Sequence, residues 1–333
     1  MERRTQHSPS PPEPSTPQSK QCLTVGDQDA GQRLDRFLAG KLAGFSRSAL
    51  GKLIRSGAVR VDNRSSKAGY RLRSGNSIEV TIPHQEPVSL VPRRIEFPIL
   101  YEDEALLVLS KPPGLVVHPA CGHTDYTLVH GLLHHCSSLP AGDELRPGIV
   151  HRLDMDTSGI MLVAKKEEVL RALSADFKNR KIGKVYHAIL VRTPREAEGR
   201  IVAPIARHPV HRQKMAVCSQ GGRYAATRWQ LHETLAQGMG FAKIYLETGR
   251  THQIRVHMAS IGCPVAGDKL YGGTLSRRVP VRASRHLLHA SELRFTHPLT
   301  GQAMMLRAPL WPDMQAILDQ LRDSSDKIET IPR

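Results

Sequence analysis

Long hydrophobic runs are missing from this chain of 333 residues. No apolar stretch approaches the ~20 residues that a helix needs to cross a bilayer. The amino terminus carries charge but has no apolar core of the kind found in signal peptides. These absences argue against a membrane span and a secretory leader, so we expect a cytoplasmic protein that does not bind membranes.

Cysteine is scarce and dispersed. The five cysteines include no Cys-x-x-Cys pair; they are Cys22, Cys121, Cys136, Cys218 and Cys263. An odd, scattered set in a chain of this size argues against a disulfide framework and fits a reducing compartment. The sequence also has no internal repeat and no glycine-rich loop of the kind that binds phosphate.

Acidic residues are fewer than basic residues in this chain. The chain has 31 Asp and Glu against 47 Lys and Arg, which gives a formal net charge of +16. An excess of this size indicates a polyanionic partner, because each neutralised phosphate releases counterions and adds affinity. Its length allows one large domain with a small one, or two medium domains.

The amino-terminal region changes composition twice. Residues 1–20 are rich in Pro, Ser and Gln without apolar periodicity, so we expect a disordered tail. Residues 31–82 hold eleven Lys and Arg against three Asp and Glu, half of the net charge. Apolar residues at helical spacing predict two helices, closed by Gly57 and followed by strands at 59–63 and 77–82. We interpret residues 21–82 as a small basic domain with two helices and a β-hairpin.

The rest of the chain predicts a larger α+β domain. Residues 83–93 are proline-rich and are interpreted as a linker, residues 94–325 as the large domain, and residues 326–333 as a tail. The clearest strands are predicted at 184–191 and 242–248, and the clearest helices at 167–180 and around 314–321. Many strands without regular βαβ alternation predict a mixed, largely antiparallel sheet.

The segment His151–Gly159, with the sequence HRLDMDTSG, carries the strongest sign of chemistry. Apolar runs at 148–150 and 160–164 flank it and predict two short buried strands. The segment is therefore expected to be a loop on a rigid scaffold, a common place for catalytic residues. It holds an acid, a guanidinium, an imidazole and hydroxyls close together.

HRLDMDTSG resembles the signature loop of the RluA-type RNA pseudouridine synthases. The resemblance implies that Asp154 is the essential carboxylate and that Arg152 fills the gap left in the RNA helix by a flipped uridine. His151 and Thr157 are expected to help bind the substrate. Loss of the base from the stack costs a few kcal/mol, and a stacking guanidinium is a suitable replacement.

Two further segments resemble the same family. Lys184–Tyr186 is similar to its Lys-x-Tyr strand, which implies that Tyr186 stacks on the target uracil. Strand alternation puts Ala188 and Leu190 on the same face as this tyrosine and Val185, Ile189 and Val191 on the other. The segment 111–119, KPPGLVVHP, also resembles a family segment, and we interpret it as mainly structural.

Residues 248–257, TGRTHQIRVH, resemble the family element whose second arginine pairs with the catalytic aspartate, which implies a pair between Arg255 and Asp154. Such a cation would keep the acid ionised and orient it. Thr251 is suited to cap a helix that ends before Gly262. Its buried stripe is predicted to contain Ile254, His257, Met258 and Ile261, with His252 and Arg255 on another face.

The small basic domain resembles the RNA-binding domain named after ribosomal protein S4. The similarity rests on RLDRFL (33–38), SRSALGKLIRSGAVRVDN (46–63) and RLRSGNSIEV (71–80). Six cations are candidates for RNA contacts: Arg33, Arg36, Arg47, Lys52, Arg55 and Arg60. With this extra domain, the chain resembles most the RluD and RluC branch of the family. That branch implies 23S ribosomal RNA or a pre-ribosomal particle as partner, with tRNA or another rRNA site as the alternative, and we expect a monomer.

No cofactor or metal is expected. Isomerising uridine breaks the bond from ribose to a ring nitrogen and rejoins the base through carbon five, without redox change or group transfer. Imidazole and thiol groups are frequent in residues 118–136, which makes a zinc site the alternative. The segment has no Cys pair and no HExxH spacing, and Tyr126 and His130 stand where relatives commonly carry Gly and Asn.

Two other functions remain open. Asp154 and Asp156 could act as the carboxylate pair of an N-glycosidase, which would release free uracil, whereas a synthase retains it. A ribosome-assembly factor that binds RNA without catalysis is the second alternative. The intact HRLD, KVY and QIR segments argue against that alternative.

Overall fold

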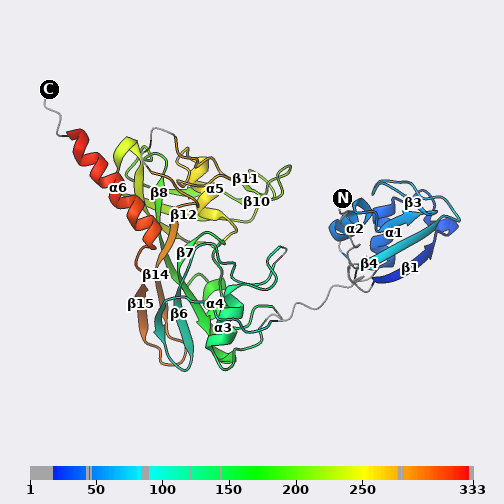
Figure 1. Cartoon of the computed structure of the whole chain (residues 1–333), viewed down its shortest axis with the longest axis horizontal. Helices are drawn as coiled ribbons and strands as arrows, with labels where there is room; N and C mark the ends of the chain where they lie inside the picture. Colours follow the sequence, from blue (N-terminus) through cyan, green and yellow to red (C-terminus); the bar gives the residue numbers. More distant parts are fainter. Residues whose placement is uncertain are drawn as a thin grey trace, which may run out of the picture. The chain divides into compact units, whose positions relative to one another are not determined.

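The computed structural model describes residues 18–42, 45, 47–83, 90–120, 122–142, 145–276, 279 and 281–329 (Figure 1). The chain divides into two compact units between residues 87 and 88, inside the segment interpreted as a linker. Each unit has a hydrophobic core of its own, and the two cores share no residue. In the described part of the chain, no helix combines the length and hydropathy required to span a membrane.

The small unit packs two helices against a four-stranded antiparallel sheet. Its helices are α1 (Leu34–Lys41) and α2 (Arg47–Arg55), and its strands are β1 (Gln18–Thr24), β2 (Val59–Val61), β3 (Arg64–Ser65) and β4 (Ser77–Pro83), in the order β1-β4-β2-β3. A short 3-10 helix, η1, spans Asp27–Asp29. The apolar residues that predicted the helices, among them Leu34, Phe37 and Leu50, form its core.

Strand β1 corrects the expected boundary of the amino-terminal tail. The strand begins at Gln18, so residues 18–20 belong to the sheet rather than to a disordered segment. All seven residues of β1 pair with β4, and this pairing satisfies the backbone groups that point toward β4. The polar sequence of β1 shows no alternation of apolar and polar residues that would predict a strand. The strand forms because it pairs with β4, which lies far along the chain. Residues 1–17 lie outside the described part of the chain.

The large unit is built on a nine-stranded mixed sheet, which confirms the expected α+β class. Its strands run in the order β5-β6-β7-β14-β8-β13-β12-β9, and β15 pairs with β14. The pair β7–β14 is parallel, and the other described pairs of this sheet are antiparallel. Their bounds are β5 Ile99–Glu102, β6 Leu106–Lys111, β7 Ser158–Ala164, β8 Gly183–Leu190, β9 Glu198–Val202, β12 Ala226–Thr234, β13 Gly240–Leu246, β14 Leu288–Thr296 and β15 Ala303–Arg307.

Helices cover the sheet in two groups. Helices α3 (Leu128–His135) and α4 (Glu167–Lys178) lie by the part that contains β6 and β7, whereas α5 (Gln253–Ser260) packs on β12 and on the hairpin β10–β11 (Ile205–Arg207, Met215–Val217) (Figure 1). Helix α6 (Pro312–Glu329) contacts the 3-10 helix η2 (Ala236–Gly238). Because α6 continues past residue 325, the expected tail boundary at 326 is wrong; residues 330–333 are not described.

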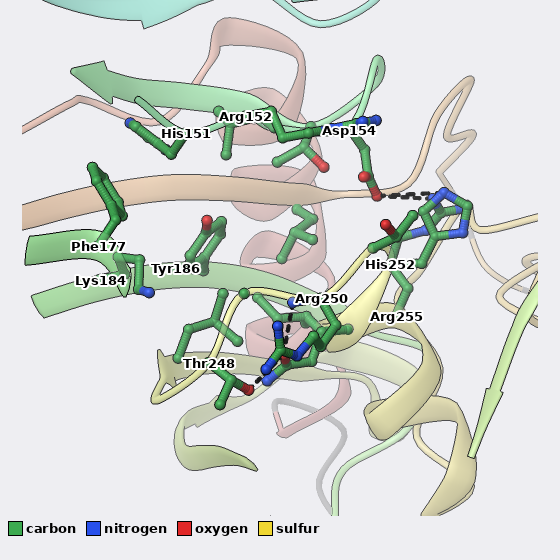
Figure 2. A pocket seen from close by; sticks show the side chains of 18 of the residues that line it. His151, Arg152, Asp154, Phe177, Lys184, Tyr186, Thr248, Arg250, His252 and Arg255 are labelled. Atoms are coloured by element: carbon green, nitrogen blue, oxygen red, sulfur yellow. Dashed lines mark hydrogen bonds and ion pairs between the residues drawn. The ribbon is translucent and has the colours of Figure 1, made fainter. Parts of the chain in front are cut away.

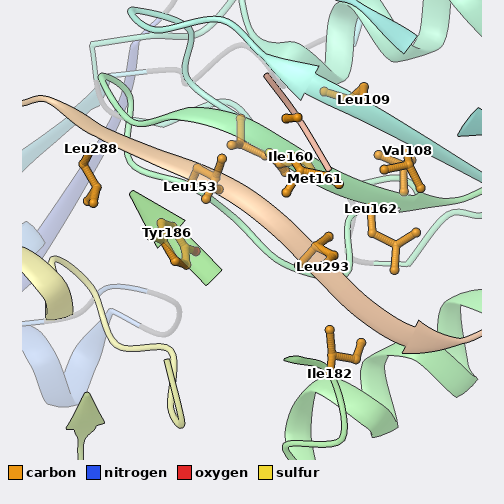
Figure 3. Packing of buried hydrophobic residues seen from close by; sticks show 14 of the residues in the cluster. Val108, Leu109, Leu153, Ile160, Met161, Leu162, Ile182, Tyr186, Leu288 and Leu293 are labelled. Atoms are coloured by element: carbon orange, nitrogen blue, oxygen red, sulfur yellow. The ribbon is translucent and has the colours of Figure 1, made fainter. Parts of the chain in front are cut away.

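The main core lies under the centre of the sheet and supports the HRLDMDTSG segment. Strand β7 is buried along its whole length and packs with β6 and β14, and Leu153 of the loop lies in the same cluster (Figure 3). Tyr186, Ala188 and Leu190 face this cluster, whereas Ile189 and Val191 pack in a second cluster with α6. The alternation predicted for β8 is thereby confirmed for these residues.

The apolar run at residues 148–150, before the HRLDMDTSG segment, is not the buried strand that the sequence predicted. Ile149 makes one isolated bridge to Val163 and is half-buried. Gly148 has φ +70°, and a side chain there would lie 2.6 Å from the carbonyl oxygen of Ala164, so the chain bends over β7 instead of pairing along it. β7 itself starts at Ser158, because Gly159 (φ +112°) lets the backbone approach Ala290 of β14 closely.

Candidate active site

A cavity of about 510 Å³ opens where the HRLDMDTSG segment meets β8 and the segment before α5 (Figure 2). Its lining comes from six places in the sequence: residues 150–157, the end of α4 with Arg180, the start of β8, Arg223, residues 246–255, and Leu288 at the start of β14. Because β7, β14 and β8 are neighbours in the sheet, segments that are distant in the sequence come together at this cavity. The candidate residues Asp154, Tyr186 and Arg255 all line this cavity.

Asp154 presents its carboxylate to the cavity and forms the predicted ion pair. Its Oδ2 accepts a hydrogen bond of 3.0 Å from Nη1 of Arg255. The side chain of Asp154 is 19% exposed and that of Arg255 is 9% exposed, so water screens the pair only partly. The Nε2 atom of His252 lies 3.9 Å from the same Oδ2.

Asp268 is a second partner of Arg255 that the sequence analysis missed. Its carboxylate accepts hydrogen bonds from Nε (2.6 Å) and Nη2 (3.0 Å) of Arg255 and is buried. Burial acts to raise the pKa of Asp268, but the bonds and charge of Arg255 outweigh it and hold that pKa below its ordinary value. Burial acts to lower the pKa of Arg255, and its two carboxylates more than reverse this, so the guanidinium stays charged.

Two buried cations hold the backbone of the loop next to Asp154. The ammonium of Lys111 donates to the carbonyl oxygens of Met155 (2.8 Å), Leu115 (2.8 Å) and Pro112 (2.6 Å). The guanidinium of Arg285 donates to the carbonyl of Asp156 at 2.9 Å. The carbonyls of both turn residues, Met155 and Asp156, are thus fixed, and the Asp154 side chain just before the turn lines the cavity.

Arg285 and Lys111 were not singled out from the sequence. Arg285 also binds both carboxylate oxygens of Asp313 in α6, at 2.7 and 2.8 Å, and so ties the loop to the last helix. Burial lowers the pKa of Lys111 to about 7, although the charges of Asp156 and Asp154 act to raise it. Lys111 ends a strongly apolar strand and begins the KPPGLVVHP segment, but neither feature predicts that its side chain is buried.

His151 and Thr157 line the cavity, but their polar atoms bind the protein. Nε2 of His151 accepts a hydrogen bond from the backbone amide of Leu162 at 2.9 Å, and its ring stacks on Phe177 with centroids 4.6 Å apart. Burial lowers the pKa of His151 to about 3, so it is neutral. Oγ1 of Thr157 forms a hydrogen bond of 2.8 Å with Nε2 of His286. Both side chains therefore shape the loop, in addition to the substrate contacts expected for them.

Tyr186 lies on the floor of the cavity, on the central strand β8 (Figure 2). It pairs with Ile244 of β13 and Ala290 of β14, so its backbone is held on both sides. Burial raises the pKa of its phenol, and the negative charge of Asp154 raises it further, so the hydroxyl keeps its proton. Its position places an aromatic face and a proton donor in the same cavity as the carboxylate.

Arginines and lysines surround the mouth of the cavity. Arg152 is exposed and lines it beside Asp154. Arg180, Arg223 and Arg250 also line it, and burial together with the charges of the other two lowers the pKa of Arg250. Such an electropositive rim is suited to the phosphates of a nucleic acid.

Helix α5, within the TGRTHQIRVH segment and beyond it, differs from its prediction at both ends. His252, not Thr251, occupies the N-cap of α5, with left-handed φ +55° and no hydrogen bond from a capping side chain. Ile261 is 37% exposed, because the helix ends at Ser260 and Ile261 has left it. Arg255 is buried with Ile254 and Met258, whereas the prediction placed it on a face directed away from the core. The predicted neighbourhood of His252 and Arg255 is confirmed, since both lie at Asp154.

The cations proposed for RNA contact in the small unit differ in how exposed their side chains are and in whether they bind other residues. Arg36, Lys52, Arg55 and Arg60 are exposed. Arg33 is half-buried and its guanidinium binds both carboxylate oxygens of Asp35, at 3.0 and 3.3 Å, so it is less free than predicted. The side chain of Arg47 lies outside the described residues.

The described histidines and cysteines of residues 118–136 do not gather into one cluster. His130 bonds the hydroxyl of Thr127 inside the unit, and Cys121 is not described. His135 and Cys136 instead lie near Glu102, with one ligand atom from each within 4.8 Å of the others. Lys165 also binds Glu102, at 2.7 Å, and an ammonium at this position disfavours a cation.

The paired-carboxylate alternative is not favoured by the site. Asp154 lines the cavity, and Asp156 is not among its lining residues. The charge of Asp156 acts on the buried Lys111 instead. Among the described residues, the cavity thus offers one carboxylate, from Asp154, where a glycosidase of the two-acid type needs a pair.

Comparison with known proteins identifies the family. The family model for RNA pseudouridylate synthase matches residues 105–260, and the model for the S4 domain matches residues 32–78. An uncharacterized RNA pseudouridine synthase of Synechocystis sp. is 41% identical over 302 residues, covering 90% of this chain and 91% of the relative. The chain belongs to the RNA pseudouridine synthase family.

Other relatives of this pseudouridine synthase agree. The ribosomal large subunit pseudouridine synthase D of Zymomonas mobilis is 39% identical over 312 residues, covering 91% of this chain and 98% of the relative. The solved structure of human RNA Pseudouridylate Synthase Domain Containing 1 is 25% identical with a TM-score of 0.55, and covers 74% of this chain and 99% of that one. The resemblance on which the sequence analysis rested, including the S4 domain, is confirmed.

Proposed function

We propose that this pseudouridine synthase isomerises uridines of the large-subunit ribosomal RNA, with Asp154 as its essential carboxylate. The relatives called ribosomal large subunit pseudouridine synthase D, at about 40% identity over most of the chain, support this RNA as substrate. One observation carries the assignment of the carboxylate: Asp154 lies in the cavity, bound to Arg255 and next to the buried Tyr186.

Each of the three residues has a role that its position supports. Arg255 occupies Oδ2 of Asp154, which leaves Oδ1 for the sugar or base of the uridine. The guanidinium favours the ionised carboxylate. Tyr186 offers an aromatic surface on which the detached uracil can stack and a phenol that keeps its proton. Exclusion of water by the buried floor would let the base rejoin through carbon five before hydrolysis.

Access to the cavity requires that the uridine leave its helix. Unstacking costs a few kcal/mol, which contacts elsewhere have to offset. Arg152 is exposed beside Asp154 and can stack in the gap. Arg180, Arg223 and Arg250 can bind flanking phosphates, and the exposed cations of the small unit, Arg36, Lys52, Arg55 and Arg60, can anchor the RNA further away. The reaction needs no cofactor in this scheme. Monomeric state and cytoplasmic location stay predictions.

The decisive experiment is to deplete the protein from its cell and map pseudouridines across all rRNA and tRNA. We expect specific sites in 23S rRNA to revert to uridine, and the purified protein to restore them on an unmodified transcript. Loss confined to tRNA would contradict the proposed substrate but keep the chemistry. Release of free uracil, or no lost site at all, would contradict the isomerase role of the Asp154 site.

A further inference from the structure

His252 is held more firmly than a residue at the mouth of a cavity requires. Its Nδ1 lies 2.8 Å from the hydroxyl oxygen of Tyr271, and the two rings meet edge to face. Nε2, the other ring nitrogen, points at Asp154 with a distance of 3.9 Å to Oδ2 (Figure 2). Its backbone is left-handed, a conformation that costs free energy in most residues and marks a position fixed by its surroundings.

The hydrogen bonds around Tyr271 favour one tautomer of the His252 imidazole. The hydroxyl oxygen of Tyr271 accepts a hydrogen bond of 2.8 Å from the backbone amide of Met215 in the β10–β11 hairpin. The hydroxyl proton is then free to be donated to Nδ1 of His252. A neutral imidazole that accepts at Nδ1 must carry its hydrogen on Nε2.

His252 is neutral at this position. Burial lowers the pKa of its imidazole and the positive charge of Arg255 lowers it further, although Asp154 acts in the opposite direction. With its hydrogen on Nε2, the imidazole is a neutral N–H donor that faces the carboxylate of Asp154. The distance of 3.9 Å is longer than the roughly 3 Å of a hydrogen bond, and a small rotation of either side chain would close it.

We propose that His252 is a positioning residue that donates a hydrogen bond from Nε2 to Oδ2 of Asp154 when RNA fills the cavity, and that Tyr271 fixes the tautomer that makes this possible. The inference rests on the proposed role of Asp154. With Arg255 as the other donor, Oδ2 would be held by two groups, and Oδ1 would keep one orientation toward the uridine. When RNA excludes solvent from the cavity, an unpaired Nε2–H is costly, and the Oδ2 of Asp154 lies 3.9 Å away as its acceptor.

The substitutions His252→Asn and His252→Gln separate positioning from mere folding. Asparagine accepts the left-handed backbone better than glutamine, but its amide is too short to reach Asp154. Glutamine can place an amide N–H where Nε2 lies. We expect His252→Asn to lower the maximal single-turnover rate about ten-fold or more, the scale of a hydrogen bond to a charged group. His252→Gln should stay within a few-fold, and neither should change the protein concentration for half-saturation.

Tyr271→Phe completes the test. It keeps the ring that lies 5.1 Å from the guanidinium of Arg255 and removes the hydroxyl. In the natural protein we expect it to slow turnover several-fold, because the imidazole proton can then move to Nδ1. In a His252→Gln background it should cost little, since an amide has no tautomer. The loss of the acceptor for Met215 is common to both backgrounds and cancels in the double-mutant cycle.

The assay uses an unmodified 23S rRNA transcript with uridine tritiated at carbon five, which loses its label as pseudouridine forms. A wild-type rate in His252→Asn, or an equal effect of Tyr271→Phe in both backgrounds, would overturn the proposal. Asp154→Asn in the same assay distinguishes a failure of the proposed function from a failure of the present inference. If it retains activity, the proposed role of Asp154 fails; if it is inactive while the His252 variants are normal, only the present inference fails.

Discussion

Asp154 and Asp268, 114 residues apart in the sequence, bind the same guanidinium. Arg255 gives Nη1 to Asp154 and its Nε and Nη2 to Asp268. The bidentate pair with the buried acid fixes the plane of the guanidinium, and the remaining nitrogen then defines where Oδ2 of Asp154 lies. Asp268 also accepts the backbone amides of Leu270 and Tyr271, so the segment that contacts His252 depends on the same carboxylate.

The first prediction concerns this shared arginine. Asp268→Asn removes the charge but keeps the size of the side chain, and we expect turnover to fall between ten- and about a hundred-fold because Arg255 loses its orientation. RNA affinity should change little. Single-turnover rates at saturating protein measure the effect, with Asp319→Asn, an exposed acid on α6, as control. A loss no greater than in the control would show that Arg255 is oriented without Asp268.

The second prediction concerns the carboxylate itself. Asp154→Asn preserves shape and removes charge and basicity, so isomerisation should disappear while the dissociation constant for RNA stays within a few-fold. Tritium release from the labelled transcript and filter binding measure the two quantities. Turnover above about 1% of the natural rate would be inconsistent with an essential role for Asp154.

The third prediction is a loss of stability in acid. Burial lowers the pKa of His151 to about 3 and those of His187, His286 and His289 to about 4. Between these values and the ordinary 6.5, the unfolded chain binds more protons than the folded one, so stability falls as the pH drops from about 6.5 toward 4. Each histidine contributes at most about 1.4 kcal/mol per pH unit.

Urea unfolding at several pH values, followed by tryptophan fluorescence, tests this dependence. Both tryptophans, Trp229 and Trp311, belong to the large unit, so the signal reports that unit alone. His187→Phe is the matched variant, because it removes one titration and keeps a ring against Phe241. Its stability should depend less steeply on pH than that of the natural protein. Equal slopes would contradict the assignment of His187 as a half-buried neutral base.

The fourth prediction concerns the separate roles of the two units in RNA binding and in catalysis. The unit of residues 88–333 has its own core, so it should stay folded when residues 1–87 are removed. The charge of +8 in residues 31–82 goes with the deletion, and each lost phosphate contact lowers the log–log salt slope of RNA binding by about 0.7 to 0.9. Saturating RNA should still be modified, at lower apparent affinity. Unchanged affinity and salt slope would show that the small unit does not contact this RNA.

The fifth prediction concerns metal. Activity should survive prolonged chelation, and the purified protein should hold well under one zinc per chain, because the candidate mechanism uses a carboxylate, a phenol and a guanidinium. Glu102, His135 and Cys136 are the described group that could bind an ion. Cys136→Ser serves as control and should leave activity unchanged. Stoichiometric zinc that leaves together with activity would overturn this view.

Local pattern determined much of what the sequence predicted correctly. Apolar residues at helical spacing placed α1, α2 and α4, and alternation placed Tyr186 on the core face of β8. These features depend on neighbours a few residues away, which the sequence displays directly. The family and the pairing of Asp154 with Arg255 came from motifs whose residues are contiguous in the chain.

Contacts between distant segments decided the rest. Nothing near Asp268, Lys111 or Arg285 in the sequence shows that these charges lie buried around one loop, since their partners come from other strands and helices. A charged residue next to an apolar strand ordinarily predicts exposure, and only the carbonyls of the folded loop make burial of Lys111 tolerable. The same holds for β1, which is a strand because β4 pairs with it, and for His252, whose Nδ1 lies against the hydroxyl of Tyr271, 19 residues later in the sequence. Sequence alone thus determined which residues could do chemistry here, and tertiary structure decided how they are held, because the free energy of a buried charge depends on partners that only folding brings together.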